Sequence, residues 1–136
     1  MKTWKKNLLL AVGIIVAAGV MLITSHTRYA AFVEQFDYSK AKATGLPMLV
    51  EFGYQACPPC KDMVPVLKSL AKEHSESFAI GYVDVMKDRQ VGLENEIQVT
   101  PTLVFYDKDG KELFRWRGKM TEDQVIVKWK ELEVVF

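Results

Sequence analysis

The two cysteines of the chain, Cys57 and Cys60, are the residues best suited to carry out a reaction, and only two prolines separate them. A strand-like apolar run, residues 48–52, leads into the pair and a helical pattern follows it, which places Cys57 where a strand becomes a helix. Helix amides and the positive end of the helix dipole stabilise an anion there, and the thiolate is the reactive form of cysteine. We therefore predict that Cys57 is a nucleophile and that Cys60, one turn further on, is the resolving thiol of a redox-active disulfide.

Other kinds of site fit the composition less well. With a net charge of +1 and no basic face beyond the N-terminal lysines, the chain is not expected to bind nucleic acid. Two cysteines cannot supply the four ligands of a structural zinc site, and His26 and His74 are not at ligand spacing from them. We therefore expect neither a metal nor an organic cofactor. One alternative from another class stays open, a binding module whose two thiols hold a soft metal such as Cu(I) for delivery to a membrane enzyme.

Further residues between about positions 48 and 125 resemble the thioredoxin family in type and order. A single Cys-x-x-Cys motif is a weak signal, whereas several matched features in the same order are a strong one. The matching positions are Glu51 for a buried acid, Pro65 for a helix-kinking proline, Val99–Thr102 for a loop with a cis-proline, Asp109–Gly110 for a hairpin turn and Gly118 for a late glycine.

The resemblance implies an α/β fold of the thioredoxin type and assigns roles to three residues beside the cysteines. Glu51 would lie buried beneath the pair with a raised pKa and would transfer the proton of Cys60, whereas the alternative is a carboxylate at the edge of the sheet in water. Pro101 would restrict access beside Cys57. Thr100 would offer backbone groups to an extended segment of a protein substrate.

Three positions differ from the family pattern. Ala56 stands where a tryptophan usually precedes the first cysteine, and Gly53 stands at another aromatic position just upstream. No lysine faces the buried acid from the next expected strand, which reads Ile80-Gly-Tyr-Val-Asp84. These differences bear on redox potential, on partner choice and on the role of Glu51 rather than on the fold.

The residues between the cysteines predict the direction of the reaction. Pro58 and Pro59 form the active-site loop and have no N–H, so the amide of Cys60 is the first that can donate to a Cys57 thiolate. A less stabilised thiolate favours the disulfide form, which makes the dithiol a stronger reductant. We therefore predict a reductase of protein disulfides. A disulfide oxidase and a cytochrome-assembly protein that reduces one client are the alternatives.

The N-terminal residues predict a membrane segment. Residues 8–23 form an uncharged apolar run of sixteen residues, long for the core of a signal peptide and slightly short for a membrane span. No small-x-small cleavage site follows, so we favour an uncleaved anchor in the lipid bilayer. Three lysines precede the run and Arg28 follows it, which places the N-terminus in the cytoplasm. The catalytic domain would then face the periplasm or cell exterior from a bacterial inner membrane, and a membrane redox partner would recharge it.

The chain divides by pattern into an anchor or signal segment, residues 1–25, a tether, residues 26–36, and one domain, residues 37–136. The domain patterns predict a mixed sheet of about four strands, two parallel and two in a hairpin, with helices on both faces. The expected strands are residues 48–52, 78–85, 103–107 and 112–117, the last with Phe114 and Trp116 in the core. The expected helices are residues 38–44, a helix from the cysteines to about His74, residues 88–96, and a last helix begun by the capping box Thr121–Gln124.

Overall fold

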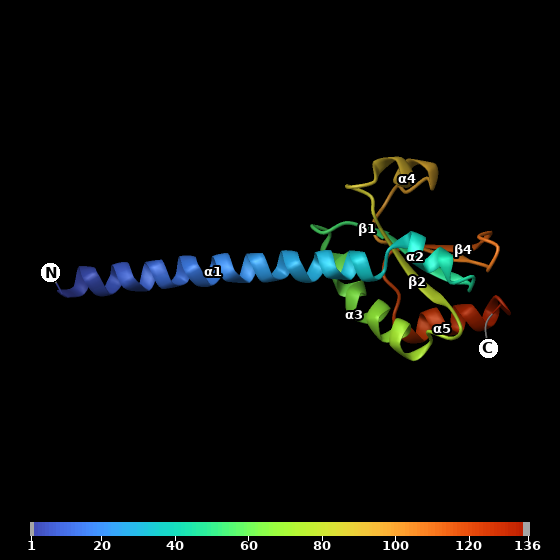
Figure 1. The fold of residues 1–136 in the computed structure, drawn as a ribbon, viewed down its shortest axis with the longest axis horizontal. Helices are drawn as coiled ribbons and strands as arrows, with labels where there is room; N and C mark the ends of the chain where they lie inside the picture. The colour runs from blue at the N-terminus through green and yellow to red at the C-terminus, as the bar shows by residue number, and fades with distance from the viewer. Residues whose placement is uncertain (1, 135–136) are drawn as a thin grey trace. The chain divides into compact units, whose positions relative to one another are not determined.

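The computed structural model describes residues 2–134 of the chain. The chain divides into two compact units, and the division falls between Phe32 and Val33. The first unit consists of most of one long helix, α1, and the second unit contains the remaining helices and strands, most of which Figure 1 labels.

Helix α1 spans Lys2–Gln35, so the predicted apolar run and most of the predicted tether form one continuous helix. Its stretch Lys6–Gln35 is long and apolar enough to cross a membrane, a property that a signal sequence near an N-terminus shares. The hydroxyls of Thr24, Ser25 and Thr27 donate to carbonyls three or four residues earlier, so these polar groups are satisfied within the helix. Helix α1 is therefore a candidate membrane span.

The second unit is built on a four-stranded mixed sheet with the strand order β2-β1-β3-β4. The strands are β1 (Met48–Gly53), β2 (Ala79–Asp84), β3 (Thr102–Tyr106) and β4 (Glu112–Arg117). Strand β1 pairs in parallel with β2, while β3 runs antiparallel to both β1 and β4. The predicted mixed sheet, with one parallel pair and one hairpin, is confirmed.

Four helices accompany the sheet, and their ends follow from local sequence. They are α2 (Tyr38–Ala43), α3 (Pro58–Glu73), α4 (Arg89–Glu94) and α5 (Glu122–Glu131). The predicted capping box at the start of α5 is present, with Thr121 and Gln124 each bonded to the other's backbone amide. Helix α4 is shorter than predicted because Asp88 is its N-cap and Glu96 adopts a φ of 53°, a left-handed conformation that cannot continue a helix.

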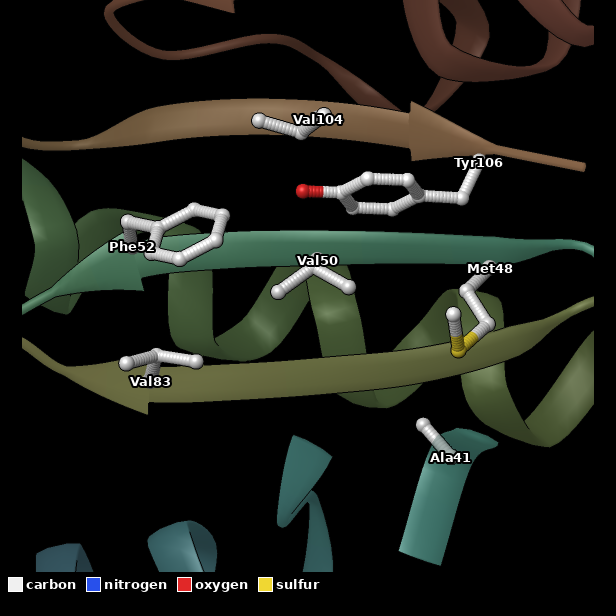
Figure 2. Packing of buried hydrophobic residues seen from close by; sticks show 7 residues of the cluster. All are labelled: Ala41, Met48, Val50, Phe52, Val83, Val104 and Tyr106. Carbon is white, nitrogen blue, oxygen red and sulfur yellow. The ribbon is translucent and has the colours of Figure 1, made fainter. Parts of the chain in front are cut away.

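One face of the sheet carries a cluster of buried apolar side chains that alternate along the strands. Figure 2 shows this cluster, which comprises Ala41, Met48, Val50, Phe52, Val83, Val104 and Tyr106. Ala41 comes from α2, and the partly buried Val91 of α4 packs against the same cluster. Helices α2 and α4 therefore cover this face.

Helices α3 and α5 cover the opposite face and lie side by side in Figure 1. Trp129 of α5 packs edge-to-face on Phe105 of β3, with ring centroids 4.9 Å apart, and lies 5.2 Å from Phe78. The predicted helices on both faces are thus confirmed. Strand β1 is buried over its full length, which explains its nearly continuous apolar sequence and makes its one acid, Glu51, an exception.

The hairpin of β3 and β4 forms as predicted, but one of its aromatics is not in the core. Gly110 in the turn has a φ of 82°, which favours glycine. Phe114 packs edge-on against Phe105 at 5.6 Å, whereas Trp116 is 43% exposed. The prediction for Trp116 is wrong because β4 is an edge strand, and its indole N–H donates to the carbonyl of Lys119 at 3.1 Å.

Candidate active site

The two cysteines lie at the turn between β1 and α3. Strand β1 ends at Gly53, and the amide of Cys57 donates to the carbonyl of Tyr54 at 3.1 Å, which closes the turn. Cys57 is the N-cap of α3, and Pro58 and Pro59 are its first two residues. Proline suits this place because amides in the first turn of a helix have no partner within it. The predicted position of Cys57 between strand and helix is confirmed.

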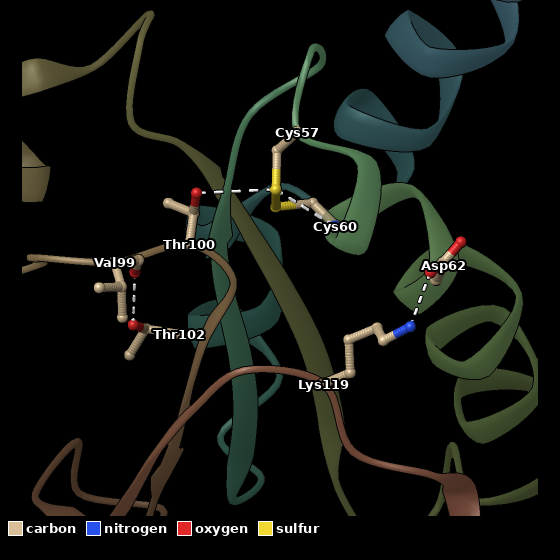
Figure 3. Close-up of a disulfide and its surroundings, with 7 residues drawn as sticks. All are labelled: Cys57, Cys60, Asp62, Val99, Thr100, Thr102 and Lys119. Carbon is tan, nitrogen blue, oxygen red and sulfur yellow. Dashed lines mark hydrogen bonds and ion pairs between the residues drawn. A yellow bond between two sulfur atoms is a disulfide. The ribbon is translucent and has the colours of Figure 1, made fainter.

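Cys57 and Cys60 form a disulfide, with Cα atoms 5.3 Å apart and each residue only 2% exposed. Two groups donate to Cys57 Sγ, the amide of Cys60 at 3.2 Å and the hydroxyl of Thr100 at 3.6 Å, as Figure 3 shows. Because Pro58 and Pro59 have no N–H, the Cys60 amide is the first backbone donor available to Cys57 Sγ, as predicted.

The loop before β3 supplies the second of these donors. The Thr100–Pro101 peptide bond is cis, and Pro101 is buried. Two hydrogen bonds hold the loop, one from Thr102 Oγ1 to the carbonyl of Val99 at 2.7 Å and one from the amide of Gly118 to the carbonyl of Pro101 at 2.8 Å. The contact of the Thr100 side chain with Cys57 was not predicted, since the sequence suggested a role only for its backbone.

An ion pair near the cysteines connects two elements that border the site. Lys119 lies in the segment after β4, and its Nζ is 2.8 Å from Oδ2 of Asp62 (Figure 3). Asp62 is in α3, two residues after Cys60. Both side chains are more than half exposed, so the pair contributes at most about 1 kcal/mol to the stability of the fold.

Glu51 is fully buried on β1, with 0% of its surface exposed. Neither of its carboxyl oxygens has a hydrogen-bond partner among the described residues. Burial disfavours the charged form and raises the pKa of the Glu51 carboxyl to about 8 when the cysteines form a disulfide. The prediction of a buried acid with a raised pKa is confirmed, and the alternative of an edge carboxylate in water is wrong.

The Glu51 carboxyl and the sulfur of Cys60 border the same small space next to Gly53. A Cβ atom added to Gly53 would lie 3.0 Å from Glu51 Oε1 and 3.1 Å from Cys60 Sγ, so both atoms border the small space that this glycine leaves. The hydroxyl oxygen of Tyr82 borders the same space, also at 3.0 Å. The sequence analysis did not assign Tyr82 to the site. The two predicted parallel strands could have indicated it, because their register pairs Glu51 with Tyr82.

One cluster of possible metal ligands occurs elsewhere in the part of the chain that the structure describes. Ligand atoms of Glu73, His74 and Glu122 lie within 4.8 Å of one another. The Ser69 hydroxyl donates to both carboxylates, and the His74 ring stacks on Phe78. His74 is the C-cap of α3 and Glu122 is the first residue of α5. Each side chain type is favoured at that helix end by the helix dipole, which explains these positions without a metal.

Comparisons with known proteins agree with this geometry. A family model described as "Thioredoxin" matches residues 25–131, a range that contains every site residue described above. The chain is 39% identical to a thioredoxin of Chlamydia caviae over 90 residues, which cover 66% of this chain and 85% of that one. It is 26% identical to the chloroplastic thioredoxin Y of Oryza sativa subsp. japonica over 125 residues, 85% of this chain and 73% of the relative. The germline-specific thioredoxin Deadhead of Drosophila melanogaster superposes with a TM-score of 0.62 at 25% identity, covering 70% of this chain and 90% of that one.

Proposed function

Because the chain belongs to the thioredoxin family and is a thiol-disulfide oxidoreductase, we propose that it reduces protein disulfides at the outer face of a membrane. The surroundings of Cys57 Sγ support the reductive direction. This sulfur accepts hydrogen bonds from the Cys60 amide and the Thr100 hydroxyl, but Pro58 and Pro59 cannot donate to it. A thiolate with few donors is poorly stabilised, and the pair therefore gives up its electrons readily.

The reaction begins when the Cys57 thiolate attacks one sulfur of a substrate disulfide. A mixed disulfide forms, and the other substrate sulfur leaves as a thiolate. The Glu51 carboxylate then takes the proton of the Cys60 thiol, and the Cys60 sulfur attacks Cys57 Sγ. The Cys57–Cys60 disulfide forms, the mixed disulfide breaks and the bound substrate sulfur leaves as a thiolate, so that two electrons have passed from the cysteine pair to the substrate. A membrane redox partner returns the chain from its disulfide form to the dithiol.

Insulin reduction tests this function directly. The full-length chain, reduced and held in detergent, is expected to accelerate the reduction and precipitation of insulin over the rate with dithiothreitol alone. A copper titration of the same reduced protein is run in parallel, because the alternative of a copper-binding module predicts a different pair of results. Tight stoichiometric Cu(I) binding without insulin reduction would replace our proposal with that alternative.

We further propose that α1 anchors the chain through residues 8–23 with the catalytic domain outside the cytoplasm. The large apolar side chains in this run are at least half exposed, as lipid-facing side chains are, and the lysines before it oppose translocation of the N-terminus. A reporter enzyme that works only after export, fused after Phe136, is expected to be active in cells. The protein is also expected to stay with membranes after a carbonate wash. Recovery of a soluble chain that begins between Thr24 and Ala31 would show a cleaved signal peptide instead.

A further inference from the structure

Two buried polar side chains on neighbouring strands border one small space next to the resolving cysteine. The register of β1 and β2 pairs Glu51 with Tyr82, and these side chains are 0% and 2% exposed. As described above, Glu51 Oε1, Tyr82 Oη and Cys60 Sγ all border the position where Gly53 lacks a Cβ, at 3.0, 3.0 and 3.1 Å. A carboxyl, a phenol and a thiol thus share one small space.

Gly53 leaves room for this arrangement. A Cβ at 3.0–3.1 Å would make a tighter contact than nine in ten real Cβ atoms do, so a larger residue at position 53 would shift the carboxyl, the phenol or the sulfur by a few tenths of an ångström. The hydroxyl of Tyr82 borders the space that a side chain at position 53 would enter.

The groups that face Glu51 determine how its charged form is stabilised. From α3 comes the Cys60 sulfur, from β2 the Tyr82 hydroxyl, and the residue paired with Glu51 on β3 is the apolar Leu103. Burial is the one cause that raises the pKa of the carboxyl, so no charged neighbour among the described residues offsets it. A buried carboxylate without a hydrogen-bond donor is unfavourable in free energy. The phenol of Tyr82 keeps its proton at neutral pH and can therefore act as a donor to Glu51.

In the disulfide form neither carboxyl oxygen of Glu51 has a hydrogen-bond partner among the described residues. We propose that Tyr82 is a positioning residue for proton transfer: when Glu51 ionises, the Tyr82 hydroxyl donates a hydrogen bond to the carboxylate and so holds it ready to accept the proton of Cys60. This inference rests on the proposed function. When the Cys60 thiol gives its proton to Glu51, the carboxylate becomes a neutral acid, the hydrogen bond from Tyr82 weakens, and the Cys60 sulfur is free to attack Cys57. Tyr82 neither gains nor loses a proton over the whole step.

The test is the pH dependence of the second step in full-length Tyr82→Phe, with Tyr106→Phe as the matched control. Tyr106 is also a buried tyrosine with a bonded hydroxyl, which donates to Asn95 at 3.2 Å, but it lies in the cluster on the other face of the sheet. Loss of a donor to the charged form raises the pKa of an acid. The decay of the mixed disulfide in Tyr82→Phe is therefore expected to be tenfold slower or more at pH 7 and to recover about one pH unit higher than in wild type.

A second measurement does not depend on turnover. The infrared carbonyl band of protonated Glu51, identified by its loss in Glu51→Gln, is expected to persist to higher pH in Tyr82→Phe and in Gly53→Ala than in wild type or Tyr106→Phe. An unchanged titration of this band, or a rate that falls equally at every pH, would overturn the role of Tyr82. Failure of the proposed function would look different, because wild type would then either form no mixed disulfide or equilibrate with glutathione at the potential of a disulfide oxidase.

Discussion

Replacement of Cys57 by serine is expected to reduce disulfide exchange to the background rate, while Cys60→Ser keeps the first attack and accumulates a mixed disulfide. A serine hydroxyl does not ionise at neutral pH and so cannot replace the thiolate nucleophile. The surroundings of the two sulfurs divide the roles. Cys57 Sγ accepts hydrogen bonds from the Cys60 amide and the Thr100 hydroxyl, whereas Cys60 Sγ borders the same small space as the Glu51 carboxyl.

These two variants form a matched pair, since each removes one sulfur atom from the same turn. Each reduced variant is mixed with a peptide disulfide, and intact mass spectrometry measures the covalent adduct. Cys60→Ser should carry one peptide on Cys57, and Cys57→Ser should carry none. The opposite pattern would reverse the roles of nucleophile and resolving thiol. The same Cys60 variant, expressed in cells, should remain linked to substrates and to the recharging partner and so identify both.

Glu51→Gln is expected to slow the second step of the reaction on the order of tenfold or more at neutral pH, with little effect on the first attack. The amide keeps the shape of the carboxyl but cannot accept the proton of Cys60. In steady-state terms kcat should fall while KM for a protein substrate changes little. Rapid-quench measurement of the formation and decay of the mixed disulfide separates the two steps. Unchanged decay in Glu51→Gln would leave Glu51 with a structural role only.

The same substitution should also change how stability depends on pH. Since the pKa of Glu51 is raised from 4.5 to about 8 by burial, the folded disulfide form holds a proton that the unfolded chain releases. The contribution of the Glu51 carboxyl to the free energy of unfolding is therefore fully present below pH 4.5 and is lost as the pH rises to about 8. Its upper limit is roughly 5 kcal/mol. Denaturant midpoints should fall across this window in wild type but not in Glu51→Gln. Glu76→Gln, a change at an exposed glutamate, is the control and should behave as wild type.

The sequence predicted the sheet and most of the site because these depend on local patterns and on ordered motifs. The apolar run at β1, the turn glycine Gly110 and the capping box at Thr121 each act within a few residues, so a one-dimensional pattern contains them. The burial of Glu51 followed from the resemblance and from its place in a strand covered on both faces.

Contacts across the fold could not be predicted in this way. The Thr100 hydroxyl reaches Cys57 Sγ across 43 residues of sequence, and only the fold brings the loop before β3 to the start of α3. Strand register pairs Tyr82 with Glu51, and a glycine leaves the space that both side chains border. Exposure of Trp116 depends on β4 being an edge strand, which alternation along that strand alone cannot reveal.

The reduction potential of the Cys57–Cys60 pair tests the central claim, that this chain is a reductase, most directly. Equilibration of the full-length protein with glutathione redox buffers, with thiols counted by alkylation and mass, measures this potential. The scarcity of donors to Cys57 Sγ predicts a value near about −270 mV, in the range of reducing thioredoxins. It also predicts a less negative value for Pro58→Gly, which restores one amide. A wild-type potential near about −120 mV, that of a strong disulfide oxidant, would contradict the account.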